Sequence, residues 1–273
     1  MPLLVWIILF TAVGGIASAA FAGVFLLLPE ATGRRLLPHF ISYATGALLG
    51  AALLALLPDA MEGIGPNGAH SVGLAMVVGL GIFFIIEKVV LWWHTRAFGN
   101  GHAHDHGHAD GHSHGHHAHD HGRVATSGVL VIIGDSIHNA LDGVLIAAAF
   151  LTSFPLGLVT TFAVAAHEIP HRVGDFAILV HSGMSRGRAL VMNMATGLTS
   201  IVGGVAAYFG LQRTYGALPY AIALAAAGFL YIAVAGLIPG LQRRADPGTS
   251  LAQVVLMALG VATIAWAESL AHQ

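Results

Sequence analysis

Two short stretches of this chain carry residues that could bind a metal ion. The stretch "HEIPHRVGDF" contains His167, Glu168 and His171, and "GDSIHNALDG" contains His138 and Asp142. Ligand-type residues stand four positions apart in each stretch, which places them on one face of a helix. The chain has no cysteine, so any metal must use nitrogen and oxygen ligands. His-Glu-x-x-His is also the zinc motif of many metalloproteases, so hydrolysis and non-hydrolytic metal binding are both candidates.

The elements that must position these residues are membrane helices. The chain is 56% hydrophobic and 9% charged, with a mean hydropathy of +0.78, whereas soluble domains carry about 25% charged residues. A span needs about 20 apolar residues. The sequence therefore predicts an all-α polytopic membrane protein of a single domain, residues 1–273, in the lipid bilayer. Its eight transmembrane helices are expected at 3–28, 39–58, 71–94, 126–152, 156–181, 188–210, 217–240 and 250–271.

The positive charges of the connecting segments set an orientation. With both termini on the extracytoplasmic side, the outer loops hold only Arg213. This asymmetry fits the positive-inside rule. The net charge of −2 predicts no nucleic-acid partner, and the first segment lacks the basic start of a cleaved signal peptide, so it is interpreted as a retained helix. The inner loops hold Arg34, Arg35, Arg96, Arg123, Arg186, Arg188, Arg243 and Arg244.

The two motifs are expected to meet at one depth in the membrane. A short "TSFP" turn makes the fourth and fifth spans antiparallel neighbours, and each motif lies near the middle of its span. Ionisable groups at that depth are costly and usually functional. One four-ligand site of the kind that suits zinc follows from His138, Asp142, His167 and His171. Asn139 and Glu168 could contribute to a second, more oxygen-rich position, and Pro170 frees the carbonyl of Ala166.

Three features favour a transporter over an intramembrane protease. The "LDG" at 141–143 precedes the His-Glu-x-x-His motif, whereas such proteases take a third ligand from a later Asp-Gly. Pro170 would bend the helix that presents both histidines, and Asp142 is accompanied by His138 and Asn139, which a protease does not need. Glu168 would be a ligand in a transporter and the general base in a protease.

Residues 95–124, between the third and fourth spans, form a low-complexity histidine-rich segment. Its stretch "GHAHDHGHADGHSHGHHAHDHG" has no apolar residues to build a core, so a disordered cytoplasmic loop is predicted. Alternating histidine and aspartate can hold zinc, nickel or copper in several geometries. We interpret the loop as a metal-capture or sensing tract that transport does not require. Its histidines are His102, His104, His106, His108, His112, His114, His116, His117, His119 and His121.

"HNALDG" followed by "HEIPHRVGDFAILVHSGMS" resembles the ZIP (Zrt/Irt-like) family of divalent-metal transporters, in its histidine-rich branch. "GALLGAALLALLP", "FFIIEKVVLWWH" and "GFLYIAVAGLIPGL" resemble the family's second, third and seventh spans. The resemblance implies eight helices, both termini outside, and a binuclear metal site between helices four and five. A bundle of helices one, four, five and six would slide against helices two, three, seven and eight, which in many members form a homodimer. The implied ligands are His138, Asn139, Asp142, His167, Glu168 and His171.

Several positions depart from the family's pattern. Arg172 stands where glutamate is common, and we expect its side chain to point away from the metal, about 100° round the helix from His171. The sixth span offers no carboxylate, which puts the second metal position in doubt. The other departures are Ala51 and Ala55 in the second span, Gly236 and Gly240 in the seventh, and Asn193, Thr196 and Ser200 in the sixth.

The expected function is transport of Zn2+ toward the cytoplasm by alternating access, in a bacterial inner membrane. Fe2+, Mn2+, Cd2+, Co2+ and Ni2+ could use the same nitrogen and oxygen ligands. The protein is not expected to be an enzyme. The alternatives are an intramembrane zinc metalloprotease and a membrane metal sensor, which would bind metal without flux. Further candidates for a metal relay are Asp135, Asp175, His181, Asp59 and Glu62.

Overall fold

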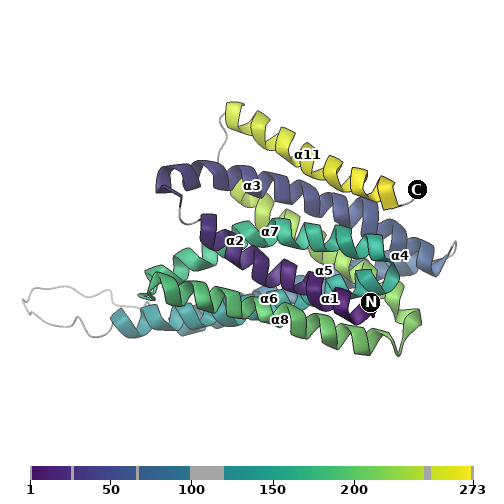
Figure 1. The fold of residues 1–273 in the computed structure, drawn as a ribbon, viewed down its shortest axis with the longest axis horizontal. Coiled ribbons are helices and arrows are strands. Elements are labelled where there is room, and N and C mark those ends of the chain that lie inside the picture. Colours follow the sequence, from purple (N-terminus) through teal and green to yellow (C-terminus); the bar gives the residue numbers. More distant parts are fainter. Residues whose placement is uncertain (1, 26–27, 66–67, 99–119, 243–246, 272–273) are drawn as a thin grey trace, which may run out of the picture.

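The computed structural model describes residues 2–25, 28–65, 68–98, 120–242 and 247–271, and every regular element in that part of the chain is a helix (Figure 1). The predicted all-α class is confirmed for these residues. The helices are α1 (Leu3–Ala12), α2 (Ser18–Phe25), α3 (Glu30–Gly50), α4 (Leu57–Ile64), α5 (Ala69–Phe98), α6 (Asp120–Thr152), α7 (Phe154–His181), α8 (Arg186–Leu211), α9 (Leu218–Tyr231), α10 (Ile238–Gln242) and α11 (Pro247–Ala271).

Three π-helical segments join consecutive helices into longer rods. Val13–Ala17 continues α1 into α2, Ala51–Leu56 continues α3 into α4, and Ile232–Leu237 continues α9 into α10. The 3-10 turn Tyr215–Ala217 precedes α9. Single π-helical turns inside α-helices often occur at functional sites. With α5, α6, α7, α8 and α11, the described residues thus form eight rods, which match the order of the eight predicted spans.

Seven of these rods, within the described residues, are long and apolar enough to cross a membrane. The rod that is not among them is α7, although its 28 residues would reach about 40 Å at 1.5 Å per residue. Its middle carries the His-Glu-x-x-His motif together with Arg172 and Asp175, which lower its hydropathy. An eighth span is therefore still a prediction.

The sequence placed some boundaries wrongly. Most of the break at 29–38 between the first two predicted spans is helical, because α3 begins at Glu30 and runs through Pro38. Leu37 and Phe40 pack there on Phe25 and Val173, and this tertiary packing outweighs the cost of an internal proline. The two helices beside the predicted 95–124 loop also extend into it, because α5 ends at Phe98 and α6 begins at Asp120.

Small residues allow α8 to lie close to its neighbours at the centre of the bundle. A Cβ built on Gly197 would lie 2.7 Å from the carbonyl carbon of Gly15, and one built on Gly203 would lie 2.8 Å from the carbonyl carbon of Ala140. No side chain fits at those distances. Such small-residue contacts are a common way to pack membrane helices, and here they hold α8 against α6 and the first rod.

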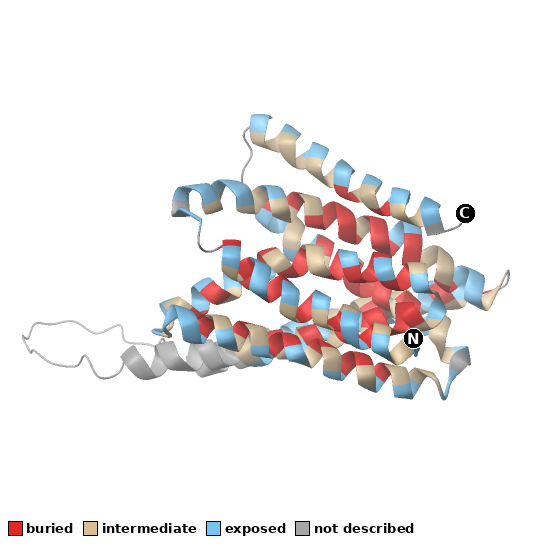
Figure 2. Cartoon of the chain, in the orientation of Figure 1, coloured by how far each residue is buried: buried red, intermediate tan, exposed pale blue. Residues whose placement is uncertain are grey.

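The burial pattern separates an inner polar and apolar core from an apolar outer surface. Figure 2 shows buried residues concentrated on α3, α6, α7 and α9, and exposed residues along α11. Leu251, Val254 and Trp266 on α11 are more than half exposed. A continuous exposed apolar surface of this kind suits contact with lipid. The start of α1 and the end of α11 lie at one end of the bundle, and the α7–α8 connection lies at the other (Figure 1).

Candidate metal centre

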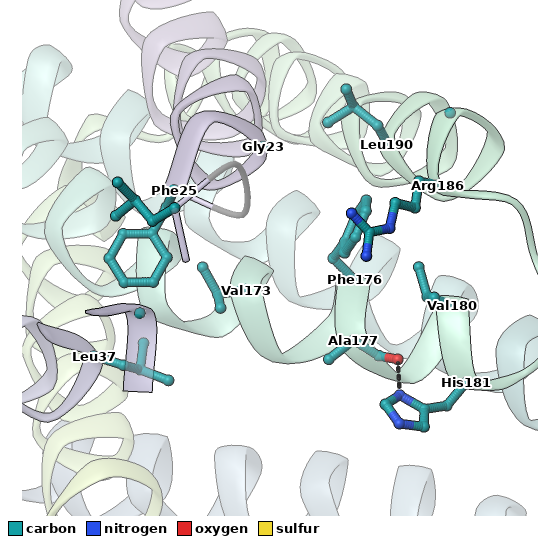
Figure 3. Close-up of a pocket in the computed structure, with 13 residues that line it drawn as sticks. Gly23, Phe25, Leu37, Val173, Phe176, Ala177, Val180, His181, Arg186 and Leu190 are labelled. Atoms are coloured by element: carbon teal, nitrogen blue, oxygen red, sulfur yellow. Dashed lines mark hydrogen bonds between the residues drawn. The ribbon is translucent and has the colours of Figure 1, made fainter. Parts of the chain in front are cut away.

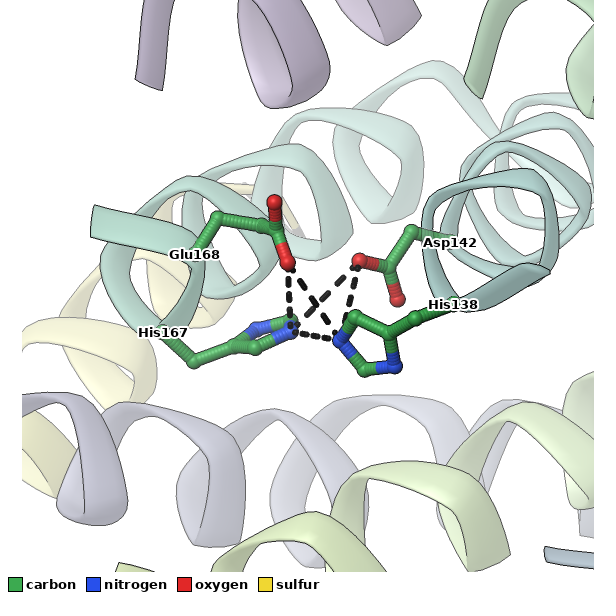
Figure 4. A group of neighbouring side chains, drawn as sticks. All are labelled: His138, Asp142, His167 and Glu168. Carbon is green, nitrogen blue, oxygen red and sulfur yellow. Dashed lines mark hydrogen bonds and ion pairs between the residues drawn. The ribbon is translucent and has the colours of Figure 1, made fainter. Parts of the chain in front are cut away.

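Four side chains from α6 and α7 converge in the middle of the bundle (Figure 4). His138 lies fourteen residues before the end of α6, and His167 lies thirteen residues after the start of α7. Ser153 alone separates the two helices, and its hydroxyl accepts a hydrogen bond from Leu156 N that begins α7. The tight turn therefore brings the two motifs to one depth, with Asp142 and Glu168 beside the histidines.

The four donor atoms have the separations of a tetrahedral zinc site. Zinc bonds of about 2.0–2.1 Å imply roughly 3.3 Å between tetrahedral ligands. His138 Nε2 lies 3.3 Å from Glu168 Oε1 and 3.7 Å from Asp142 Oδ2. His167 Nε2 lies 3.4 Å from His138 Nε2, 3.5 Å from Asp142 Oδ2 and 3.9 Å from Glu168 Oε1. All four donor atoms lie within 4.8 Å of one another, so they could converge on one ion of zinc's size.

The unsatisfied atoms of this group point to a cation. Asp142 Oδ2 and Glu168 Oε1 are buried and accept no hydrogen bond from the described residues. A buried polar atom without a partner is costly, and a bound cation would remove that cost. His167 Nδ1 lies 3.1 Å from the carbonyl oxygen of Ala163 and donates its proton there. Nε2 of His167 therefore keeps a lone pair directed at the same point.

Arg172 lies on the other side of Glu168, and its side chain is fully buried. Its Nε donates to Glu168 Oε2 at 2.8 Å, and its Nη1 donates to Asp135 Oδ2 at 3.0 Å. Its Nη2 donates to Asn139 Oδ1. The guanidinium thus stands among the residues that were predicted to form the second, oxygen-rich metal position.

The prediction that Arg172 points away from the site is wrong. The expected direction of the side chain was taken relative to His171, the preceding residue. The neighbour that matters is Glu168, which is four residues earlier and on the same helix face as Arg172. Residues of α8 complete the cage around the guanidinium: Nη1 lies 2.5 Å from Asn193 O, 2.7 Å from Asn193 Oδ1 and 2.6 Å from Thr196 Oγ1. The sequence singled out Asn193 and Thr196 only as lacking a carboxylate, and their role as arginine partners was missed.

His171 belongs to a different group from the one predicted. Its Nδ1 lies 2.9 Å from Asp175 Oδ2 and 4.0 Å from Asp135 Oδ1, and these three residues form a second cluster that could hold a metal ion. The side chain is 44% exposed, and its ring stacks on that of His138 with the centroids 5.2 Å apart. Position on the helix explains the difference, because Glu168 takes the fourth place in the first group and leaves His171 one turn further along.

The remaining predicted residues lie elsewhere. Asn139 uses its amide nitrogen on Asp135 O and Oδ1, both at 2.8 Å, and its oxygen on Arg172, so all its polar atoms have protein partners. Asp59 and Glu62 are on α4, near the end of the bundle that holds the termini. His181 ends α7, about 21 Å beyond His167 at 1.5 Å per residue. Of the histidine-rich tract, residues 102–119 and the side chain of His121 are outside the described part of the chain.

A cavity of about 680 Å³ lies beyond these clusters, at the end of α7 near its connection to α8 (Figure 3). Its lining is mostly apolar, with Phe25, Leu37 and Val173 on one side and Phe176 and Leu190 on the other. The polar side chains at its far edge are His181, whose Nδ1 lies 2.7 Å from Ala177 O, and Arg186. The cavity therefore leads away from the second cluster toward one end of the bundle without offering metal ligands of its own.

Comparison with known proteins agrees with this geometry. The family model described as "ZIP Zinc transporter" matches residues 3–267. The chain belongs to the ZIP family. This ZIP protein is 31% identical over 294 residues to "Zinc transporter ZIP13" of Homo sapiens, with 90% of this chain and 77% of the relative covered. It is 32% identical over 324 residues to "Zinc transporter SLC39A7" of Rattus norvegicus, with 90% and 69% covered.

Family membership confirms several predictions. The protein is an integral membrane protein of a transporter family, and it is not an enzyme. "Zinc transporter ZIP13" of Mus musculus, 33% identical over 264 residues with 86% of this chain and 71% of the relative covered, supports the same reading. These relatives are eukaryotic, so they give no support to the predicted bacterial inner membrane.

Proposed function

We propose that this ZIP protein carries divalent metal ions, foremost Zn2+, across a membrane toward the cytoplasm. The observation that carries the proposal is the group of His138, Asp142, His167 and Glu168, whose donor atoms stand at tetrahedral spacing with two unsatisfied oxygens. The names of the relatives point to the same cargo. Two imidazoles and two carboxylates suit zinc, and they also suit Fe2+, Mn2+, Cd2+, Co2+ and Ni2+.

The proposed direction of transport is inward, and the positions of the two clusters are compatible with it. The second cluster of Asp135, His171 and Asp175 is one helical turn from the first, toward the α7–α8 end of the bundle. Arg186 and Arg188, at the start of α8, lie at that end, which we assign to the cytoplasm by the positive-inside rule. An ion released from the first cluster would meet the second cluster before it leaves. In this orientation both termini are extracytoplasmic. We count α7 as a further transmembrane span, which brings the single transmembrane domain to eight spans.

Alternating access would require one part of the bundle to move against the other. α6 packs most extensively on α8, while α3 packs on α11 and α5 on α9. We assign the first rod, α6, α7 and α8 to a mobile bundle, and α3–α4, α5, α9–α10 and α11 to a scaffold. The close glycine contacts of α8 with α6 and the first rod lie inside the mobile bundle, so these helices would move as one body. A homodimer formed through the scaffold and capture of zinc by the histidine-rich segment are further parts of this proposal.

The geometry disfavours a protease. Glu168 would have to be the general base in such an enzyme, yet its Oε2 is bound to Arg172 Nε and its Oε1 faces the histidines. Neither oxygen is placed to activate a water molecule. In the transporter, both contacts are useful, because one oxygen binds the ion and the other holds the carboxylate in position.

The deciding experiment is uptake of Zn2+ by proteoliposomes that contain the purified full-length protein. We expect saturable uptake that empty liposomes lack, and competition by other divalent ions would rank the metals. A protein that binds zinc with the expected affinity but moves none into the vesicles would be a sensor or receptor, and the proposal would be wrong.

A further inference from the structure

The charge and placement of Arg172 carry an inference about how many ions this site holds. Its guanidinium contacts Glu168, Asp135 and Asn139, the side chains with which oxygen ligands would surround a second cation. A planar guanidinium with five N–H donors fills such a position by hydrogen bonds instead of metal bonds. We infer that Arg172 is a permanent internal cation in place of a second metal, and that the transport site proposed above therefore holds one divalent ion.

The space around the guanidinium is closed. Arg172 is the largest fully buried side chain of the described residues, with an exposure of 0%. Asn193 and Thr196 of α8 hold Nη1, and Asn193 Nδ2 donates back to the carbonyl oxygen of Arg172 at 3.1 Å. Leaving would strip these bonds from a charged group in the membrane interior, which is expensive. A second ion could therefore enter only if the arginine were removed.

The formal charges point to the same number of ions. Of the carboxylates that contact Arg172 or face the two histidines of the first group, Asp135, Asp142 and Glu168 contribute three negative charges, and Arg172 contributes one positive charge; Asp175 is not counted because it contacts His171 instead. Two negative charges remain, which a single divalent cation neutralises. Glu168 links the two positions, because its Oε2 accepts from Arg172 while its Oε1 faces the open position between the histidines. The arginine thereby also fixes the orientation of a metal ligand.

The test locates the ions directly. Crystals of the full-length protein grown with Zn2+ would be measured at the zinc absorption edge, where each bound zinc ion gives an anomalous difference peak. At the transport site of the wild type we expect one peak, between His138 and His167, and none among Asp135, Asn139 and Glu168; a peak beside His171 and Asp175 would belong to the second cluster. We expect a second peak in Arg172→Ala, among Asp135, Asn139 and Glu168, because this change vacates the space and leaves three negative charges. The histidine-rich tract does not interfere, because the peaks are identified by position.

A charge-matched variant tests whether a second ion binds because the arginine leaves space or because it leaves negative charge uncompensated. Asp135→Asn combined with Arg172→Gln removes one charge of each sign, and we expect it to keep a single peak at the transport site. A peak among Asp135, Asn139 and Glu168 in the wild type, or its absence in folded Arg172→Ala, would overturn the inference. If Arg172→Ala does not fold, the wild type still decides, because a peak at that position beside the arginine contradicts the inference. Absence of any ion between the histidines would overturn the proposed function as well, whereas an ion beside Arg172 would overturn only this inference.

Discussion

Replacement of His167 by alanine tests the four-residue group most directly. The change removes one of four donor atoms, and apparent binding free energies of four-ligand zinc sites are about 10–16 kcal/mol, or roughly 2.5–4 kcal/mol per ligand. A water molecule in the vacated position recovers part of this. We therefore expect a loss of about 2–3 kcal/mol, which is about a 30- to 150-fold weaker affinity for Zn2+ at about 1.4 kcal/mol per tenfold.

His171→Ala is the matched control, because it removes the same side chain from the same helix one turn further along. In the structure His171 Nδ1 contacts Asp175 and Asp135 rather than the first group. We expect His171→Ala to leave the affinity of the first site within about threefold of the wild type and to lower the maximal rate, since a transport step after binding is impaired. His167→Ala should therefore mainly raise the KM for Zn2+, and His171→Ala should mainly lower the maximal rate of uptake.

The assay is the initial rate of Zn2+ uptake into proteoliposomes over a range of buffered free Zn2+, with zinc binding to the purified full-length protein as the equilibrium check. Equal increases in KM for His167→Ala and His171→Ala would show that His171 is a ligand of the first site, as the sequence predicted. An unchanged KM for His167→Ala would show that the four donor atoms are not the transport site. Circular dichroism and size-exclusion chromatography would establish that both variants are folded.

Three further changes test other parts of the structure. Asp142→Asn removes one of the two carboxylates that face the histidines, so zinc affinity should fall by about tenfold or more; an unchanged binding isotherm would contradict its assignment as a ligand. Deletion of residues 101–119 should leave the initial rate of zinc uptake unchanged, because the donor atoms are on α6 and α7; an inactive but folded deletion variant would make the tract part of the transport path. Gly197→Val should lower thermal stability by about 1–3 kcal/mol or more, because a Cβ there would lie 2.7 Å from the carbonyl carbon of Gly15. Gly210→Val on the same helix is the control, since no heavy atom lies within 4 Å of its built Cβ, and equal melting temperatures for the two variants would contradict the packing described for α8.

Local spacing was sufficient to predict the helices and to bring the two motifs together. The apolar runs predicted eight rods in the right order, and the "TSFP" turn placed His138 and His167 at one depth. These conclusions depend only on helix geometry and on the length of one connection, which a sequence specifies. The start of α3 was harder to predict, because Pro38 and the two arginines before it indicate a turn, whereas in the structure Leu37 and Phe40 pack on Phe25.

The sequence by itself determined which residues are the candidate ligands, that they lie on neighbouring membrane helices, and that no thiolate is among them. Only the tertiary structure decided how they are divided: Glu168 completes the first group, His171 joins Asp135 and Asp175, and Arg172 fills the space between. The physical reason is that helix geometry puts His171 on the same face as His167 and Glu168 about 100° away, so spacing alone favoured His171 as the fourth ligand. Contacts of α7 with α6 and α8 determine which residue joins which group. Some of the contacts around Arg172 join residues far apart in the sequence, and Thr196 and Asp135 are more than sixty positions apart.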